Sequence, residues 1–259
     1  MNAGMRTSLR AVPPPAEAAE APTGAPNCTT CGRKTKPKPK PGPAPKAAPP
    51  GLSAAVQKMI SGMPADQQAL VLKSPTLQRQ LQTLADRGWK VEYAKDGGGY
   101  ADRTSKTIHL ADGYKNVAVL AHEAGHAMYT LPPEPWNFTY TGKKQFVAER
   151  VNQNLSDEGQ GQFSLGTARS EILARGGGDI GPLSIFTPSE QAVYSRYAKG
   201  EINQTQAAAQ FGQIYGGYET STTHQNYRVF YGDAAAAEWE NNANVISHGI
   251  DDLNTWWSK

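Results

Sequence analysis

The sequence predicts an α+β domain that is rich in helices, with a small β-sheet ahead of its most apolar helix. Apolar residues recur at helical spacing on both sides of residues 89–110, whereas within this range they alternate with polar residues, as in strands. Residues 1–50 differ in composition, because Pro, Ala and Lys dominate them, and we expect an extended linker there. The predicted organisation is therefore a linker over residues 1–50 and one domain over residues 51–259.

The elements are expected in the following order. Helical spacing begins at Leu52, and Pro64 and Pro75 divide residues 52–87 into three helices. Residues 89–93 and 106–110 are predicted strands that pair as a hairpin across a glycine-rich turn. Five helical segments follow, of which the second could be interrupted near Ser156: residues 115–130, 143–175, 188–198, 204–215 and 233–253.

Charge and hydropathy exclude two classes of partner. Residues 1–50 hold eight Lys/Arg against two Glu, a balance of +6, and residues 51–259 hold 18 Lys/Arg against 21 Asp/Glu, a balance of −3. A mildly acidic domain argues against nucleic-acid binding. No apolar run approaches the ~20 residues of a membrane span, so no membrane partner is expected. The first 30 residues also lack the apolar stretch of a signal peptide, so we expect any secretion to use a route that reads none.

The motif His122-Glu123-Ala124-Gly125-His126 lies in the most apolar predicted helix. Residues four apart on a helix share a face, so the two imidazoles can bind one Zn²⁺ ion. Glu123 follows His122 directly and would lie beside the metal, where a general base can take the proton of an attacking water. The alternative is a pair of hydrogen-bonded core histidines, but a buried helix after paired strands favours the metal site.

A catalytic zinc site needs a third protein ligand and one open position. The pattern H-E-x-x-H-x-x-G-x-x-H is excluded, because Tyr129 and Pro132 stand where its glycine and third histidine would be. A cysteine ligand is not expected, since Cys28 and Cys31 both lie in the linker.

A glutamate from a downstream helix therefore remains as the third metal ligand. We favour Glu158, keep Glu171 as the alternative, and place Glu149 after both. Glu158 and Glu171 are thirteen residues apart and cannot share one face of a helix, so only one of them is expected to reach the metal.

A polar segment at residues 220–227 could supply a hydrogen-bond donor to the oxyanion of a hydrolytic reaction. His224 and Tyr227 are the candidate catalytic residues there, with Tyr218 as a further choice. The alternative is a surface histidine beside core aromatic residues.

From residue 89 to residue 239 the sequence resembles the zincin-type, gluzincin-like metallopeptidase domains of bacterial polymorphic toxins and type VI secretion effectors. The segments that carry the resemblance are His122 to Ala127, Asp157-Glu158-Gly159, Arg169 to Ile172, Gly176 to Gly181 and Thr222 to Tyr231. The first of these segments is widespread among zincins, whereas all five in this order are more specific.

This resemblance implies a zincin-like fold and a zinc-dependent metallopeptidase that hydrolyses a protein or peptide substrate. It further implies an antibacterial toxin delivered to the periplasm of a competitor cell, with a cognate immunity protein and a carrier in the secretion apparatus. We also expect the strand at residues 106–110 to offer an edge to which an extended peptide adds. The alternatives are a peptidoglycan amidase or endopeptidase of the same fold, a housekeeping metalloprotease, and a binding module whose zinc is structural.

Overall fold

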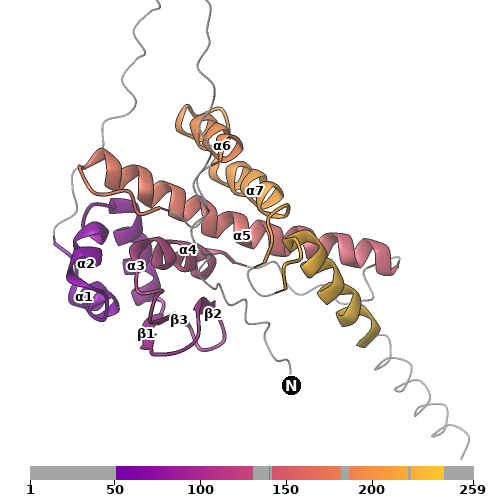
Figure 1. The fold of residues 1–259 in the computed structure, drawn as a ribbon, viewed down its shortest axis with the longest axis horizontal. Coiled ribbons are helices and arrows are strands. Elements are labelled where there is room, and N and C mark those ends of the chain that lie inside the picture. Colours follow the sequence, from indigo (N-terminus) through magenta and orange to yellow (C-terminus); the bar gives the residue numbers. More distant parts are fainter. Residues whose placement is uncertain (1–50, 131–139, 141, 182–186, 221–222, 242–259) are drawn as a thin grey trace, which may run out of the picture.

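The computed structural model describes residues 51–130, 140, 142–181, 187–220 and 223–241, so the predicted linker over residues 1–50 lies outside it. The described chain is helix-rich with one small sheet, as the sequence predicts (Figure 1). Residues 227–241 form a further helix after the labelled elements. The elements are α1 (Ala54–Ile60), α2 (Ala65–Val71), α3 (Pro75–Asp86), β1 (Lys90–Ala94), β2 (Gly99–Asp102), β3 (Thr107–Ala111), α4 (Val117–Met128), α5 (Lys143–Ala174), α6 (Pro188–Ala198) and α7 (Gln204–Tyr215).

The sheet differs from the predicted hairpin in the number of its strands and in the direction of their pairing. Residues 99–102 form the additional strand β2, and the order in the sheet is β1-β3-β2. The two predicted strands do pair, but they run parallel, whereas β2 and β3 form the antiparallel hairpin. The glycine-rich segment after β1 therefore leads into a strand instead of closing a hairpin. The expectation that residues 106–110 offer a free edge is wrong, because β3 is the central strand; β1 and β2 are the edges of the described sheet.

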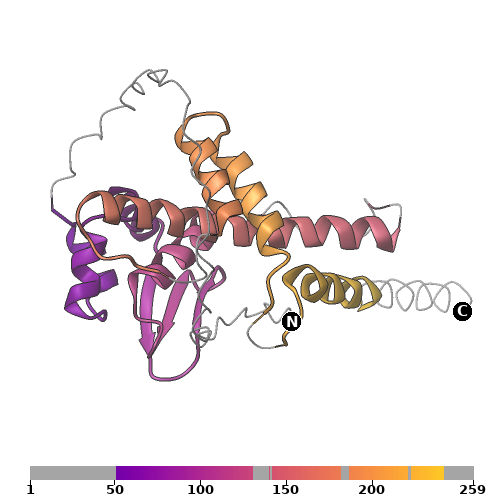
Figure 2. The same ribbon diagram turned by 45° about the horizontal axis from the view of Figure 1, so that its top comes forward.

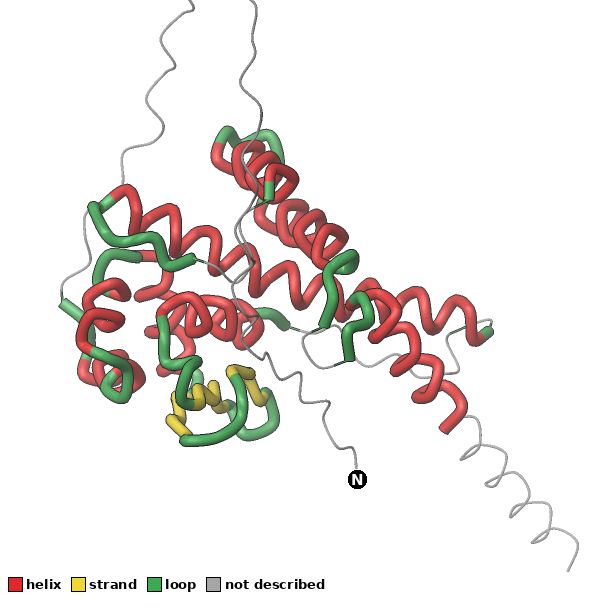
Figure 3. The backbone as a smooth tube through the Cα atoms, in the orientation of Figure 1, coloured by secondary structure: helices red, strands yellow, loops and turns green. Residues whose placement is uncertain are grey.

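Helix α4 lies between the sheet and the long helix α5, and α1 to α3 lie on the same side of α5, where α3 contacts it (Figures 1 and 2). The strands are grouped on one side of the molecule, and helices form the rest of the regular structure (Figure 3). The largest core cluster joins α1 to α4 with β3 and the C-terminal half of α5. This arrangement covers α4 on nearly all sides, as its apolar sequence predicts.

Helix α5 continues without interruption through Ser156, so the break considered there does not occur. The Ser156 hydroxyl donates to the Asn152 carbonyl one turn earlier, which satisfies it within the helix. The glycines of α5 allow close packing instead of ending the helix. A Cβ atom on Gly159 would lie 1.9 Å from the Ala208 carbonyl of α7, and one on Gly161 would lie 2.7 Å from the His122 ring of α4.

The helix of residues 227–241 packs along the N-terminal half of α5, and it begins earlier than the predicted residue 233 (Figure 1). Arg150 of α5 forms an ion pair with Glu238, and Lys143 forms one with Glu240. The predicted stretch from residue 242 to 253 lies outside the described residues. Within the described part of the chain, no helix is both long enough and apolar enough to cross a membrane.

Candidate metal site

Helix α4 presents His122 and His126 from one face. The helix begins at Val117, and the side chain of Asn116 caps it by accepting a hydrogen bond from the Val119 amide. His122 is 1% exposed, because its ring fits against the bare backbone of Gly161 in α5. The side chain of His126, one turn later, is 13% exposed. The first histidine therefore anchors the site inside the protein, and the second lies toward its rim.

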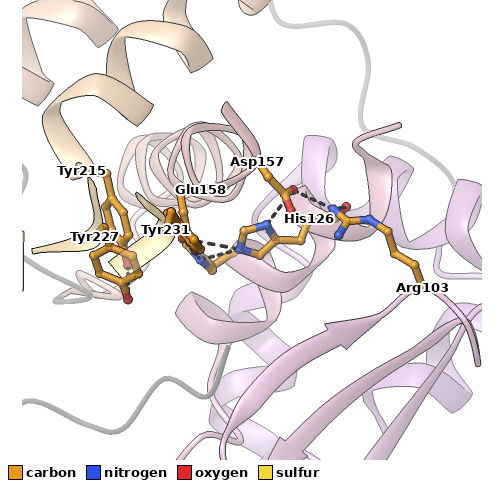
Figure 4. Close-up of polar contacts among 8 residues, drawn as sticks. Arg103, His126, Asp157, Glu158, Tyr215, Tyr227 and Tyr231 are labelled. Atoms are coloured by element: carbon orange, nitrogen blue, oxygen red, sulfur yellow. Dashed lines mark hydrogen bonds and ion pairs between the residues drawn. The ribbon is translucent and has the colours of Figure 1, made fainter. Parts of the chain in front are cut away.

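Glu158 of α5 completes a group of three side chains that could hold a metal ion (Figure 4). Its side chain is buried, and Oε2 has no hydrogen-bond partner among the described residues. Oε2 lies 3.6 Å from Nε2 of His122 and 3.7 Å from Nε2 of His126, and the two Nε2 atoms are 2.9 Å apart. Three ligand-type atoms thus point toward one common position.

The spacing of these three atoms fits a metal ion. Ligand atoms bound at about 2.0–2.1 Å to one tetrahedral zinc lie about 3.3–3.4 Å from each other. The three observed separations bracket that value. A buried carboxylate oxygen without a donor is costly unless a cation compensates it, so the unpartnered Oε2 also favours a metal at this position. Among the described residues, three protein side chains form this group.

Asp157, next to Glu158 on α5, holds the outer side of His126. Its Oδ1 atom lies 2.9 Å from Nδ1 of His126, so this nitrogen donates when it carries the proton and Nε2 is free for a metal. Arg103, in the turn between β2 and β3, donates from Nη2 to the same oxygen at 2.6 Å and to the main-chain carbonyl of His126 at 2.7 Å (Figure 4).

Tyr231 holds the outer oxygen of Glu158. Its hydroxyl donates to Oε1 at 2.5 Å, and both groups are buried. This contact engages one carboxylate oxygen and leaves the other directed at the histidines. A buried aromatic cluster extends from Tyr231 through Tyr227 to Tyr215, whose ring lies 6.4 Å from that of His122.

Glu123 lies next to the candidate metal ligands and is 2% exposed. Strand β2 passes close to it, because a Cβ atom on Gly99 would lie 3.7 Å from Oε1 of Glu123. Burial raises the pKa of Glu123, and the carboxylates of Glu158 and Asp157 raise it further against the opposing effect of the two histidines. A raised pKa suits a carboxylate that takes up and releases a proton near neutral pH.

The charges of the ligands depend on one another. Burial alone would lower the pKa of His126, but Asp157, Glu158 and Glu123 raise it to about 10 in the metal-free protein. Burial would raise the pKa of Glu158, but His122, His126 and the Tyr231 hydroxyl hold it below its ordinary value. Negative charge therefore surrounds the two histidines, and this environment favours a cation.

The alternative third ligands lie elsewhere. Glu171 accepts hydrogen bonds from the Ser74 hydroxyl, the Thr76 amide and the Thr76 hydroxyl at the start of α3, at 2.6–2.9 Å. Both of its oxygens are thus engaged in holding α3 to α5, and Glu171 is not part of the group formed by His122, His126 and Glu158. Glu149 is exposed and accepts a hydrogen bond from Gln145.

The two candidate oxyanion donors differ in their location. Tyr227 is buried in the aromatic cluster, and its hydroxyl accepts a 3.3 Å hydrogen bond from Tyr215. Burial raises the pKa of Tyr227, and the charges of Glu158 and Glu123 raise it further, so the hydroxyl stays protonated. His224 is exposed in a turn with a φ of 56°, and no contact joins its side chain to the site among the described residues.

No role in the site is assigned from the sequence to Arg103, Asp157 or Tyr231, although the last two lie in segments that carry the resemblance. A signal exists for two of them. Asp157 directly precedes the favoured ligand, and Tyr231 lies one helical turn after Tyr227. No pattern could indicate Arg103, because its contact with His126 depends on where the β2–β3 turn lies against α4.

No protein-family model matches the chain, and no curated protein or solved structure is significantly similar to it.

Proposed function

We propose that this protein is a zinc-dependent metallopeptidase. The observation that carries the proposal is the triangle of His122 Nε2, His126 Nε2 and Glu158 Oε2 beside the buried carboxyl group of Glu123. Two imidazoles and one carboxylate are a common ligand set for catalytic zinc. A zincin-like relationship is part of this proposal, supported by the H-E-x-x-H helix after a small sheet and by a glutamate ligand from the next helix.

When bound, zinc supplies a Lewis acid that lowers the pKa of water and polarises a carbonyl. His122, His126 and Glu158 would hold it. Glu123 takes the proton from the attacking water and delivers it to the leaving amine, for which its raised pKa is suited. The Tyr227 hydroxyl is the proposed donor to the oxyanion, and the exposed His224 is less well placed for that role.

The position of β2 supports a peptide as the substrate. Strand β2 is an edge strand, and its first residue, Gly99, lies beside the carboxyl group of Glu123. An extended peptide that adds to this edge by main-chain hydrogen bonds would bring a peptide carbonyl toward the general base. The proposed docking edge is therefore β2, in place of the strand at residues 106–110.

The decisive experiment compares the full-length protein with its Glu123→Gln variant. Zinc content is measured on both, and peptide products of a denatured protein substrate are identified by mass spectrometry. We expect equal zinc content, cleavage by the native protein only, and loss of cleavage in EDTA with recovery on adding zinc. Equal cleavage by the variant would contradict the role of Glu123, and a zinc-loaded native protein without hydrolase activity would favour a structural zinc.

A biological setting as an antibacterial toxin, with an immunity protein and a secretion carrier, is also part of the proposal. Its support is the ordered series of motifs between residues 89 and 239. Expression in a bacterium with an added periplasmic leader should arrest growth, and Glu123→Gln should not. Harmless periplasmic expression would favour a housekeeping protease, and release of peptides from purified sacculi would favour a peptidoglycan hydrolase.

A further inference from the structure

Arg103 makes two hydrogen bonds from one nitrogen atom. Its Nη2 donates to Oδ1 of Asp157 at 2.6 Å and to the main-chain oxygen of His126 at 2.7 Å. The same Asp157 oxygen lies 2.9 Å from Nδ1 of the His126 ring. The three groups form a closed loop, in which Arg103 contacts the backbone of His126 directly and its ring through Asp157 (Figure 4).

This loop restricts the direction in which His126 can point. The Asp157 carboxylate fixes the ring tautomer and leaves Nε2 to face His122 and Glu158. A carboxylate on a helix can rotate about its side-chain bonds, and the guanidinium group limits that rotation. The His126 carbonyl belongs to the last turn of α4, where it also accepts a 3.2 Å hydrogen bond from the Tyr129 amide and where a cation is favourable.

We propose that Arg103 is a positioning residue for the metal ligand His126, and that it makes metal affinity depend on the placement of the β2–β3 turn. The inference rests on the proposed metal site but not on peptide hydrolysis. Arg103 contacts no metal ligand atom itself. It acts through Asp157 and through the end of α4.

The β2–β3 turn keeps its own hydrogen bonds without the Arg103 side chain. Oδ1 of Asp102 accepts hydrogen bonds from the Thr104 and Ser105 amides. Replacing Arg103 by Met should therefore leave the hairpin folded, while the Asp157 carboxylate and the His126 carbonyl lose their shared donor.

Arg169→Met is the matched control. Arg169 pairs with Asp179 through two hydrogen bonds, and its side chain is 30% exposed, against 31% for Arg103. Both substitutions remove one arginine–carboxylate pair, and the two arginines are similarly exposed, but Arg169 lies toward the C-terminal end of α5, away from Asp157.

The test uses the full chain and three readouts: zinc affinity by competition with a chromogenic chelator, the visible spectrum of the Co²⁺-loaded protein, and the melting temperature in EDTA. We expect Arg103→Met to weaken zinc binding about tenfold to hundredfold and to alter the Co²⁺ spectrum. Arg169→Met should change neither. Arg103→Lys should recover part of the affinity, because the charge remains but the planar fork is lost.

Wild-type zinc affinity and an unchanged Co²⁺ spectrum in Arg103→Met would overturn the inference, whatever happens to its melting temperature in EDTA. A native protein that binds no zinc would overturn both this inference and the proposed function. A native protein that binds zinc tightly but cleaves no peptide would contradict the proposed function alone, because none of these readouts depends on hydrolysis.

Discussion

Tyr231 donates a 2.5 Å hydrogen bond to Oε1 of Glu158, although 73 residues separate the two in the chain. The helix of residues 227–241 thereby reaches into the candidate metal site and holds the one carboxylate oxygen that does not face the histidines. Helix α5 thus places the backbone of Glu158, and the hydrogen bond from Tyr231 orients its carboxylate.

Replacing Tyr231 by Phe removes this hydrogen bond and keeps the ring. We expect zinc affinity to fall about tenfold to hundredfold, because the outer oxygen of Glu158 loses its donor. Competition with a chromogenic chelator measures the change. Tyr227→Phe is the control, since that hydroxyl contacts Tyr215 and not a metal ligand, and its zinc affinity should match that of the native protein. Equal zinc affinity in Tyr231→Phe would show that Glu158 needs no such support.

Glu158→Gln and Glu171→Gln should separate metal binding from stability. The first removes the charged ligand, so the purified variant should contain far less zinc. The second weakens three hydrogen bonds at the start of α3, so it should keep its zinc but lose about 1–3 kcal/mol of unfolding free energy. Elemental analysis and urea unfolding in EDTA measure the two effects. The reverse pattern would assign the ligand role to Glu171, the alternative.

Gly161→Ala tests the space left for His122. A Cβ atom there would lie 2.7–2.9 Å from three atoms of the imidazole ring, closer than side chains normally approach. We expect weaker zinc binding and a lower melting temperature, although alanine favours helices over glycine by about 1 kcal/mol. Gly232→Ala is the matched helical control, because its Cβ atom would meet only Val151, at 3.9 Å. The control should be neutral or stabilising, and an equally neutral Gly161→Ala would refute the packing argument.

The metal-free protein should lose stability as the pH rises from 6.5 to about 10. Burial opposes the charge on His126, but Asp157 and the neighbouring carboxylates raise its folded pKa above the ordinary 6.5, to about 10. Protonation of this group thus contributes stability that is fully present below pH 6.5 and is lost as the pH approaches 10. Urea unfolding in EDTA at several pH values measures this. The difference between the native protein and His126→Gln should shrink as pH rises, and a constant difference would contradict the shift.

The sequence was sufficient for the order and type of most elements. Helices α6 and α7 begin and end at the predicted residues. Pro188 and the N-cap residue Asn203 mark where they begin, and Gly200 and Gly216 follow where they end. The sheet was predicted only in part. Four residues from Gly99 to Asp102 carry too weak an alternation to indicate a strand, and only the pairing with β3 makes them one.

The sequence by itself determined that His122 and His126 face the same side of one buried helix, because helical geometry relates residues four apart wherever the helix lies. It could not decide between Glu158 and Glu171, since both lie on α5 and the choice depends on which face of α5 meets α4. Tertiary packing places Glu158, and not Glu171, beside the two histidines, where Gly159 and Gly161 let α7 and His122 approach α5 closely. Packing also brought Arg103 and Tyr231 to the site, because contacts between elements distant in sequence follow from the folded core and not from local periodicity.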